Sequence, residues 1–203
     1  MKRLFLISLC LLAAACAKTP EQKAEILIKD TMLKTLVLPE SYQAVETQLD
    51  SAFSPYHDPE FIATVLDLYK IATNLDEIDR QMKMAKSTMS LWAGNYRTSY
   101  AREQYNQAKE EYDEASSKHE ALASKVKKIA ESLQEKAEKE PEFIGYRAHH
   151  RFRAQLNNGN TILSGEYFLL DKELTRIVAQ WSEEEINIYE SFFSSLADAA
   201  ELE

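Results

Sequence analysis

The chain is poor in the residues that break regular structure, with 4 glycines and 5 prolines among 203 residues. This shortage argues against a turn-rich all-β fold and against long disordered tracts. The 2 cysteines, Cys10 and Cys16, both lie close to the amino terminus. The rest of the chain therefore contains no disulfide, no thiolate metal site and no cysteine nucleophile.

Basic residues are also in the minority, since 24 Lys and Arg face 33 Asp and Glu, for a formal net charge of −9. An acidic chain is a poor nucleic-acid binder, because that affinity depends on neutralising phosphates. The sequence contains no nucleophile elbow, phosphate-binding loop, dinucleotide fingerprint or metal-ligand spacing. We therefore expect no nucleic-acid partner, no cofactor, no metal and no enzymatic activity.

The longest apolar run covers residues 4–15 and follows the basic pair Lys2 and Arg3. At about 1.5 Å per helical residue, this run is too short to cross a hydrocarbon core of roughly 30 Å. The pattern is instead typical of a signal peptide. We predict that residues 1–15 are a signal peptide and that no other segment spans a membrane.

The small residues before Cys16 resemble the lipobox of bacterial lipoproteins, although Ala13 stands where that motif usually has leucine. The resemblance implies that Cys16 is acylated, with palmitate among the chains, and becomes the first residue of the mature protein. Ala17 after this cysteine implies sorting to the outer membrane, facing the periplasm. Ordinary signal-peptidase cleavage after Ala15 remains the alternative.

The middle of the chain holds two long stretches in which apolar residues recur at steps of 3 and 4. The first stretch contains Phe61, Val65, Leu68, Ala72, Leu75, Ile78, Met82, Ala85, Met89 and Trp92. The second contains Ala101, Tyr105, Ala108, Tyr112, Ala115, His119, Leu122, Val126, Ile129 and Leu133. With a turn signal at Gly94, these seams predict an antiparallel coiled-coil hairpin over about 59–139, in which His119 is a polar position that sets the register.

The flanking segments predict an α+β fold. A helix is expected from Pro20 to about Leu36, and a strand over 42–53 with Val45, Thr47 and Leu49 on one face. After the hairpin we expect strands over 143–154, 161–170 and 174–181 and a last helix from 182, which starts with a capping box. A small antiparallel sheet of about four strands, with both terminal helices packed on one face, would bury the apolar residues of one domain over 16–203.

Several segments resemble small lipoproteins of unknown function that are common in Bacteroidota. Besides the lipobox, the resemblance lies in residues 21–30, 38–46, 49–54, 143–154 and 168–171. It covers both ends of the chain and leaves the helical hairpin as the variable part. It implies a location and an architecture, but no chemistry.

The segment 143–154 alternates two kinds of side chain, so a strand there has one basic face formed by Arg147, His149, Arg151 and Arg153. Such a face can bind an anion such as a phosphate or an acidic glycan. The alternatives are a solvated face, or ion pairs with Glu166 and with the acidic helices. His149 and His150 point to opposite faces and cannot chelate one metal together.

Aromatic residues are concentrated around the predicted tip of the hairpin, at Trp92, Tyr96, Tyr100, Tyr105 and Tyr112. Aromatics in excess of what two helices can bury would leave an apolar patch for a partner protein, whereas complete burial would make them core filling. We therefore expect a lipid-anchored, non-enzymatic envelope protein that serves as a scaffold or interaction module. A module that binds an anion or glycan on the basic face is the alternative, and a hydrolase with unrecognised residues is a third interpretation.

Overall fold

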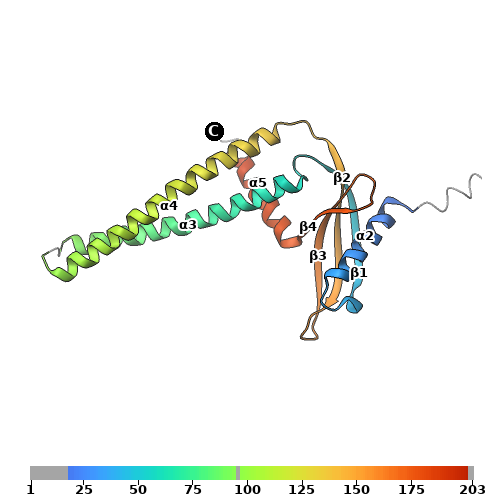
Figure 1. Cartoon of the computed structure of the whole chain (residues 1–203), viewed down its shortest axis with the longest axis horizontal. Helices are drawn as coiled ribbons and strands as arrows, with labels where there is room; N and C mark the ends of the chain where they lie inside the picture. Colours follow the sequence, from blue (N-terminus) through green and yellow to red (C-terminus); the bar gives the residue numbers. More distant parts are fainter. Residues whose placement is uncertain (1–17, 95–96, 201–203) are drawn as a thin grey trace, which may run out of the picture. The chain divides into compact units, whose positions relative to one another are not determined.

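The computed structural model describes residues 18–94 and 97–200 (Figure 1). The predicted signal peptide and Cys16 lie outside these residues. The described elements are, in chain order, α2 (Pro20–Thr35), the 3₁₀ turn η1 (Pro39–Ser41), β1 (Gln43–Phe53), α3 (Pro59–Ala93), α4 (Ser99–Ala137), β2 (Phe143–Gln155), β3 (Thr161–Leu170), β4 (Ile177–Ser182) and α5 (Glu183–Ala200). None of the described helices is long and apolar enough to cross a membrane.

The described chain divides into two compact units. One comprises the residues up to Pro59 together with Glu140–Ile188, and the other comprises Glu60–Lys139 together with the residues from Tyr189 onward. The first unit contains the sheet and α2. The second contains the helical hairpin, which is inserted between β1 and β2 in the sequence, and most of α5.

The four strands form one antiparallel sheet in the order β1-β2-β3-β4, so the α+β prediction is confirmed. The β2–β3 register follows from the tight turn that closes on Gly159, which has a φ of 82°. The predicted start of the last strand at Leu174 is wrong, because Leu174 has a φ of 55° and lies in a turn. The Asp171 carboxylate stabilises this turn by accepting hydrogen bonds from the backbone N–H groups of Thr175 and Arg176.

The strand predicted at 42–53 is present, but its expected face is interrupted. The pairing of β1 with β2 shifts between Ala44 and Glu46, so Val45 occupies a β-bulge and is exposed. Thr47 and Leu49 keep the expected direction and lie toward the core. The bulge inserts one residue into the strand, so the period of two predicted from the sequence does not hold through it.

Helix α2 packs on one face of the sheet and starts where the sequence predicts. Thr19 and Gln22 form a capping box, in which each side chain accepts a hydrogen bond from the other residue's backbone N–H. Since residues four apart share one helix face, the buried residues of α2 form a single stripe. This stripe contacts Ala148, Phe152, Ala154, Phe168 and Leu170 of the sheet, and its own members are Ala24, Ile28 and Met32.

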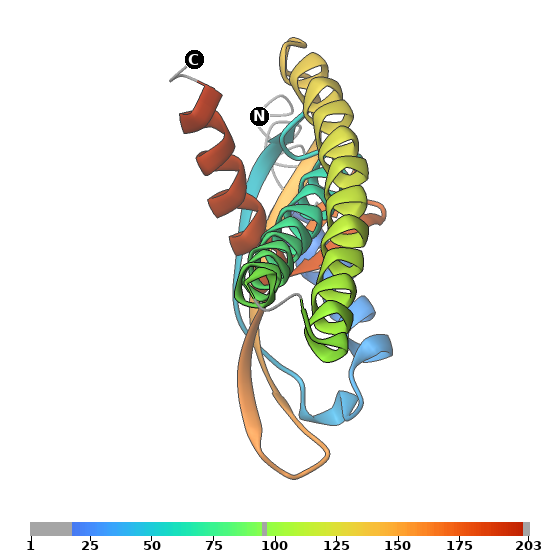
Figure 2. The same ribbon diagram turned by 90° about the vertical axis from the view of Figure 1, so that its left-hand side faces the viewer.

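Helices α3 and α4 form an antiparallel pair, and Figure 1 and Figure 2 both show them side by side. Every residue of both predicted seams is buried or half-buried. Contacts join the helices along their length. Lys136 donates to Glu60 at 3.0 Å, His119 Nε2 lies 3.4 Å from Asp79 Oδ1, and the Trp92 and Tyr100 rings meet edge to face. The predicted hairpin is therefore confirmed, and His119 contacts Asp79 across its seam.

Helix α5 begins with the predicted capping box, since Ser182 and Glu185 exchange hydrogen bonds between side chain and backbone. Its first residue, Glu183, reaches the sheet face opposite α2. The first turn of α5 and helix α2 therefore lie on opposite faces of the sheet. The expectation that both terminal helices pack on one face is wrong for the first turn of α5. Further along α5, Phe192 and Phe193 make edge-to-face contacts with Tyr69 and Phe61 of α3.

Candidate functional site

The basic face of β2 is the face of the sheet opposite α2. Directly opposite residues of antiparallel strands share a face. The register places Gly165 and Tyr167 of β3 beside Arg151 and His149, and it places Gln48 of β1 on the other side of His149. The hairpin between β2 and β3 therefore brings an aromatic ring into the middle of the basic face.

Two of the four predicted residues are held by this ring. The His149 imidazole stacks on the Tyr167 ring, with centroids 4.4 Å apart and planes 10° apart. The Arg147 guanidinium lies 4.5 Å from the centre of the same ring, in a cation–π contact. These contacts give His149 and Arg147 a structural partner within the sheet.

A carboxylate also approaches the basic face. Glu183 Oε1 lies 3.5 Å from His149 Nε2, a nitrogen that accepts or donates no hydrogen bond within the described part of the chain. Gly165 makes room for this approach, because a Cβ there would stand 2.6 Å from Glu183 Oε2. The negative charge of Glu183 beside His149 lowers the attraction of this part of the face for an anion.

The two outer arginines are in a different situation. Among the described residues, no hydrogen bond or ion pair involves Arg151 or Arg153. However, Glu46 lies directly opposite Arg151 on β1, so the face carries charges of both signs. Anion binding stays a prediction, and heparin-resin retention of the native chain against an Arg151→Glu/Arg153→Glu variant decides it.

The alternative in which the basic face forms ion pairs with Glu166 is wrong. Glu166 lies opposite His150 in the register, and therefore on the other face of the sheet. There it accepts a hydrogen bond from the Gln180 side-chain amide. Burial and the neighbouring Glu185 charge raise the pKa of Glu166, while the bond from Gln180 opposes that shift.

His150 is a buried residue of the core, with 1% of its surface exposed. Its Nε2 lies 2.8 Å from the Tyr42 hydroxyl and its Nδ1 lies 2.9 Å from the Thr47 hydroxyl. Burial, with a smaller contribution from His149, lowers the pKa of His150 and favours the neutral ring. Both ring nitrogens are therefore occupied in a structural role, and neither is available to a metal or substrate.

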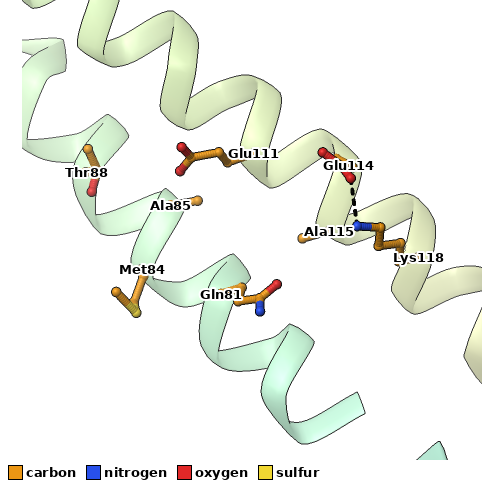
Figure 3. Close-up of a pocket in the computed structure, with 8 residues that line it drawn as sticks. All are labelled: Gln81, Met84, Ala85, Thr88, Glu111, Glu114, Ala115 and Lys118. Carbon is orange, nitrogen blue, oxygen red and sulfur yellow. Dashed lines mark ion pairs between the residues drawn. The ribbon is translucent and has the colours of Figure 1, made fainter. Parts of the chain in front are cut away.

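The second candidate site is a groove along the hairpin. Two adjoining hollows of about 310 and 500 Å³ share Gln81 and Lys118 as lining residues. We call them together the hairpin groove; its other lining residues are Asn74, Ile78, Met84, Ala85 and Thr88 of α3 and Glu111, Glu114, Ala115, Ala121 and Leu122 of α4. In Figure 3, Ala85 and Ala115 point toward one another across the gap and Met84 points away from α4.

Small seam residues give the groove its floor. Ala85 and Ala115 are buried, and neither side chain is long enough to fill the space between the helices. The polar wall on α4 is internally paired, since Lys118 bonds to Glu114 at 2.6 Å and Gln107 donates to Glu111 at 3.1 Å. The bond from Lys118 lowers the pKa of Glu114, which keeps this carboxylate charged.

The groove continues toward the hairpin tip as an exposed apolar stripe. Met84 is 71% exposed, and Leu91, seven residues further along α3, is 68% exposed. Tyr100 of α4 is 59% exposed and lies fourteen residues, or about four helical turns, before the groove residue Glu114. Residues at these spacings lie on the same side of their helix. Met84, Leu91 and Tyr100 therefore lie on the side of the hairpin where the groove opens.

The aromatic residues singled out in the sequence divide between burial and exposure. Trp92, Tyr105 and Tyr112 are half-buried along the seam, as expected for core filling. Tyr100 is exposed, and Tyr96 lies outside the described residues. The apolar surface near the tip therefore consists of Tyr100 together with two aliphatic residues, Met84 and Leu91, that the aromatic pattern did not indicate.

Sequence reasoning missed Tyr167 as a partner of the basic face, and it missed the hairpin groove. The contact of His149 with Glu183 of α5 agrees with the ion pairs to the acidic helices that the sequence left as an alternative. The stacking of Tyr167 on His149 follows from the turn at Asn158 and Gly159, once that turn sets the register. The groove left a weaker signal, the alternation of alanine with larger residues along the seam. In the described ranges, no group of three His, Cys, Asp or Glu side chains is placed to hold a metal ion.

Comparisons with known proteins give no similar protein from which a function could be inferred. No protein-family model, no curated protein and no solved structure matches it. The functional argument therefore depends on the residues and on their geometry.

Proposed function

We propose that this chain is a lipid-anchored protein of the bacterial envelope that has no catalytic role. In this proposal Cys16 carries the acyl chains, the protein faces the periplasm from the outer membrane, and the hairpin is the element that contacts a partner protein. The sheet and α2 form the body of the protein, and the hairpin is inserted between two strands of that sheet in the sequence.

The observation that supports this proposal best is the exposed apolar stripe on the groove side of the hairpin. Met84, Leu91 and Tyr100 are each more than half exposed, and they lie along one side of the hairpin. The residues that line the groove include no histidine, cysteine or serine, and the lining Lys118 is held in an ion pair with Glu114. A surface of this kind suits the binding of an apolar helix face better than it suits chemistry.

Membrane anchoring is tested by replacing Cys16. We expect the native chain to incorporate palmitate and to enter the detergent phase with the membranes, because its acyl chains partition into lipid. The Cys16→Ser variant should incorporate no palmitate and should stay in the aqueous phase. Cys10→Ser, a change within the predicted signal peptide, should behave as the native chain. An unmodified amino terminus at residue 16, measured by mass spectrometry on the native protein, would contradict the anchor.

The contact role of the hairpin is tested with a photo-crosslinking amino acid at Leu91. We expect irradiation of intact cells to attach a second polypeptide chain at this position, because an exposed apolar stripe gains stability when it is covered. The matched control is Ser90, an exposed neighbour whose side chain points about 100° away on the same helix. Equal labelling at Leu91 and Ser90, or no adduct at Leu91, would refute the role proposed for the hairpin.

A further inference from the structure

We infer that the side of α2 that points away from the sheet lies against an anionic phospholipid surface, as a second membrane contact beside the acylated Cys16. This contact rests on the proposed lipid anchor and adds the orientation of the first unit on the membrane. We call this side the outer face of α2; its apolar and charged members, all exposed, are Lys23, Ile26, Lys29, Asp30, Leu33 and Lys34. Three features support the contact: a second set of apolar residues, lysines without partners, and a short tether.

Apolar side chains lie on both sides of α2. The buried stripe of this helix faces the sheet (Figure 1). Ile26 stands two residues from both Ala24 and Ile28 of that stripe, which is about 200° of rotation, so it points away from the sheet. Leu33 follows Ile26 by seven residues and therefore shares its side. Ile26 is 42% exposed and Leu33 is 38% exposed. A helix that only covers a sheet needs one apolar stripe, so this second pair is available to another apolar surface.

Three lysines border the apolar pair. Lys23 and Lys29 each stand three residues from Ile26, one on either side of it, and Lys34 follows it by eight residues. In the described part of the chain, none of their ammonium groups forms an ion pair or a hydrogen bond. Asp30 is the one carboxylate on the outer face. Lysine side chains are long enough to reach lipid phosphates while the apolar residues between them enter the interface.

The charge of the outer face is opposite to that of the whole chain. The outer face holds three basic side chains and one acidic side chain, whereas the chain has a formal net charge of −9. An anionic lipid surface therefore repels the protein as a whole and attracts this face. The difference in charge orients the first unit with α2 toward the lipid.

The tether brings α2 within reach of the membrane. Pro20, the first residue of α2, follows Cys16 by four residues, which span at most about 14 Å at 3.6 Å per residue. An anchor at Cys16 therefore holds the start of α2 close to the lipid, and a second contact beside it loses little further freedom. A small apolar surface is then sufficient, whereas a stable protein complex usually buries about 800 Å² on each partner.

The basic face of β2 is the competing membrane contact. It lies on the opposite side of the sheet from α2, so the two faces cannot both rest on one flat surface. Glu46 lies opposite Arg151 on this face, and Glu183 approaches His149, so its charge is mixed. The tether also enters the described chain at α2, which favours the outer face over the basic face.

The experiment uses the full acylated chain in vesicles of phosphatidylethanolamine and phosphatidylglycerol, with a nitroxide on some headgroups. In the proposed mature protein Cys10 has been removed and Cys16 is acylated, so one introduced cysteine takes a fluorescent dye selectively. Leu33→Cys reports on the outer face, and Arg153→Cys, at an exposed position of the basic face, is the matched control. We expect the headgroup nitroxide to quench the dye at position 33 at least about threefold more than at position 153, because an interfacial helix lies at headgroup depth.

The role of charge is tested in the chain labelled at Leu33→Cys. The triple variant Lys23→Glu/Lys29→Glu/Lys34→Glu should lower the quenching to the level measured with Arg153→Cys, because the phosphates then repel the outer face. Replacing phosphatidylglycerol by the neutral phosphatidylcholine should lower the quenching in the same direction, without any change to the chain. Circular dichroism must show the same helix content for the variant and the native protein.

A second triple variant controls for net charge. Lys83→Glu/Lys86→Glu/Lys125→Glu changes the formal charge by the same amount at exposed positions of the hairpin. It should leave the quenching at position 33 unchanged, because it does not alter the outer face. If it lowers the quenching as much as the α2 variant does, the effect belongs to the whole protein, and a specific contact by α2 is overturned.

The remaining outcomes separate this inference from the proposed function. A chain that floats with the vesicles but is quenched equally at Leu33→Cys and Arg153→Cys, or more strongly at the latter, would overturn the contact by α2 and leave the anchor in place. A chain that does not float with the vesicles would overturn both. In intact cells, a photo-crosslinking amino acid at Leu33 that attaches mainly to a second polypeptide would show a protein on the outer face, and would also overturn the lipid contact.

Discussion

Replacing Gly145 by alanine should abolish the native sheet. Gly145 has a φ of 150°, a region open almost only to glycine, and a Cβ there would stand 2.0 Å from the backbone oxygen of Leu170. The obstacle is a neighbouring main chain that is part of the paired strand β3, so no side-chain rotation relieves it. We expect a loss of at least about 4 kcal/mol in the free energy of unfolding, measured by urea denaturation followed by circular dichroism.

A matched control separates backbone strain from the clash. Gly159 also has a positive φ, of 82°, but its Cβ would meet nothing within 4 Å. Gly159→Ala should therefore lower the free energy of unfolding by about 1 kcal/mol, which is the strain of the left-handed conformation alone. If Gly145→Ala unfolds at the same urea concentration as Gly159→Ala, the close approach of Gly145 to Leu170 is not a constraint on the fold.

Replacing His150 by leucine should destabilise the first unit by about 2–4 kcal/mol, because it leaves two hydroxyl groups without their partner. Tyr42 and Thr47 each bond to one nitrogen of this ring, and the residue is almost completely buried. Tyr42→Phe removes only one of these bonds, so its loss of unfolding free energy should be about half as large. Equal stability of His150→Leu and the native chain would show that the two bonds contribute nothing net.

The same residue should make stability depend on pH. Because burial lowers the pKa of His150 below its ordinary value of 6.5, the folded state binds fewer protons than the unfolded state as the pH falls below about 6.5. The free energy of unfolding should therefore be greatest above this pH and should decrease as the pH is lowered. Subtracting the His150→Leu curve from the native curve isolates the contribution of His150.

Glu166, opposite His150 on the same face, acts in the reverse direction. Its raised pKa means that the folded state holds a proton that the unfolded state releases above pH 4.5, so its contribution to stability decreases as the pH rises. The decline due to His150 should therefore be partly compensated in the most acidic part of the range. A native curve that stays flat from pH 7.5 to 5.5 relative to His150→Leu would contradict the assignment of His150 as a neutral core residue.

Local features of the sequence were enough to predict most elements. The capping pair Thr19 and Gln22 marks the start of α2, and the turn residues Asn158 and Gly159 mark the β2–β3 hairpin, because both signals act within four residues. The seams of α3 and α4 were predictable for the same reason, since a helical period repeated over many turns averages out single exceptions.

The errors lie where strand pairing or the closing of a turn sets the conformation. The bulge at Val45 exists only through the pairing with β2, and Leu174 takes a positive φ in the turn that Asp171 closes. Glu166 was assigned to the wrong face, although the alternation within β3 and the register with β2 place it opposite His150. Strand pairing is a long-range property, so short-range patterns predict its irregularities poorly.

The basic face also combines features that local sequence predicts with features that depend on distant segments. The four members of the basic face were predictable, because successive side chains of a strand alternate between its two faces. The contacts of two of them, Arg147 and His149, with Tyr167 and Glu183 depend on the adjacent strand and on a glycine that leaves room for a carboxylate. No pattern within β2 contains that information.

For the hairpin, the amino-acid order was sufficient to establish two paired helices and the residues along their seam, because apolar burial at a regular period has one solution for a helix. The groove arose only on folding, when Ala85 and Ala115 met across the seam and left a space that neither could fill. Which apolar residues stay in water is a property of both helices together, since exposure depends on what the opposite helix covers.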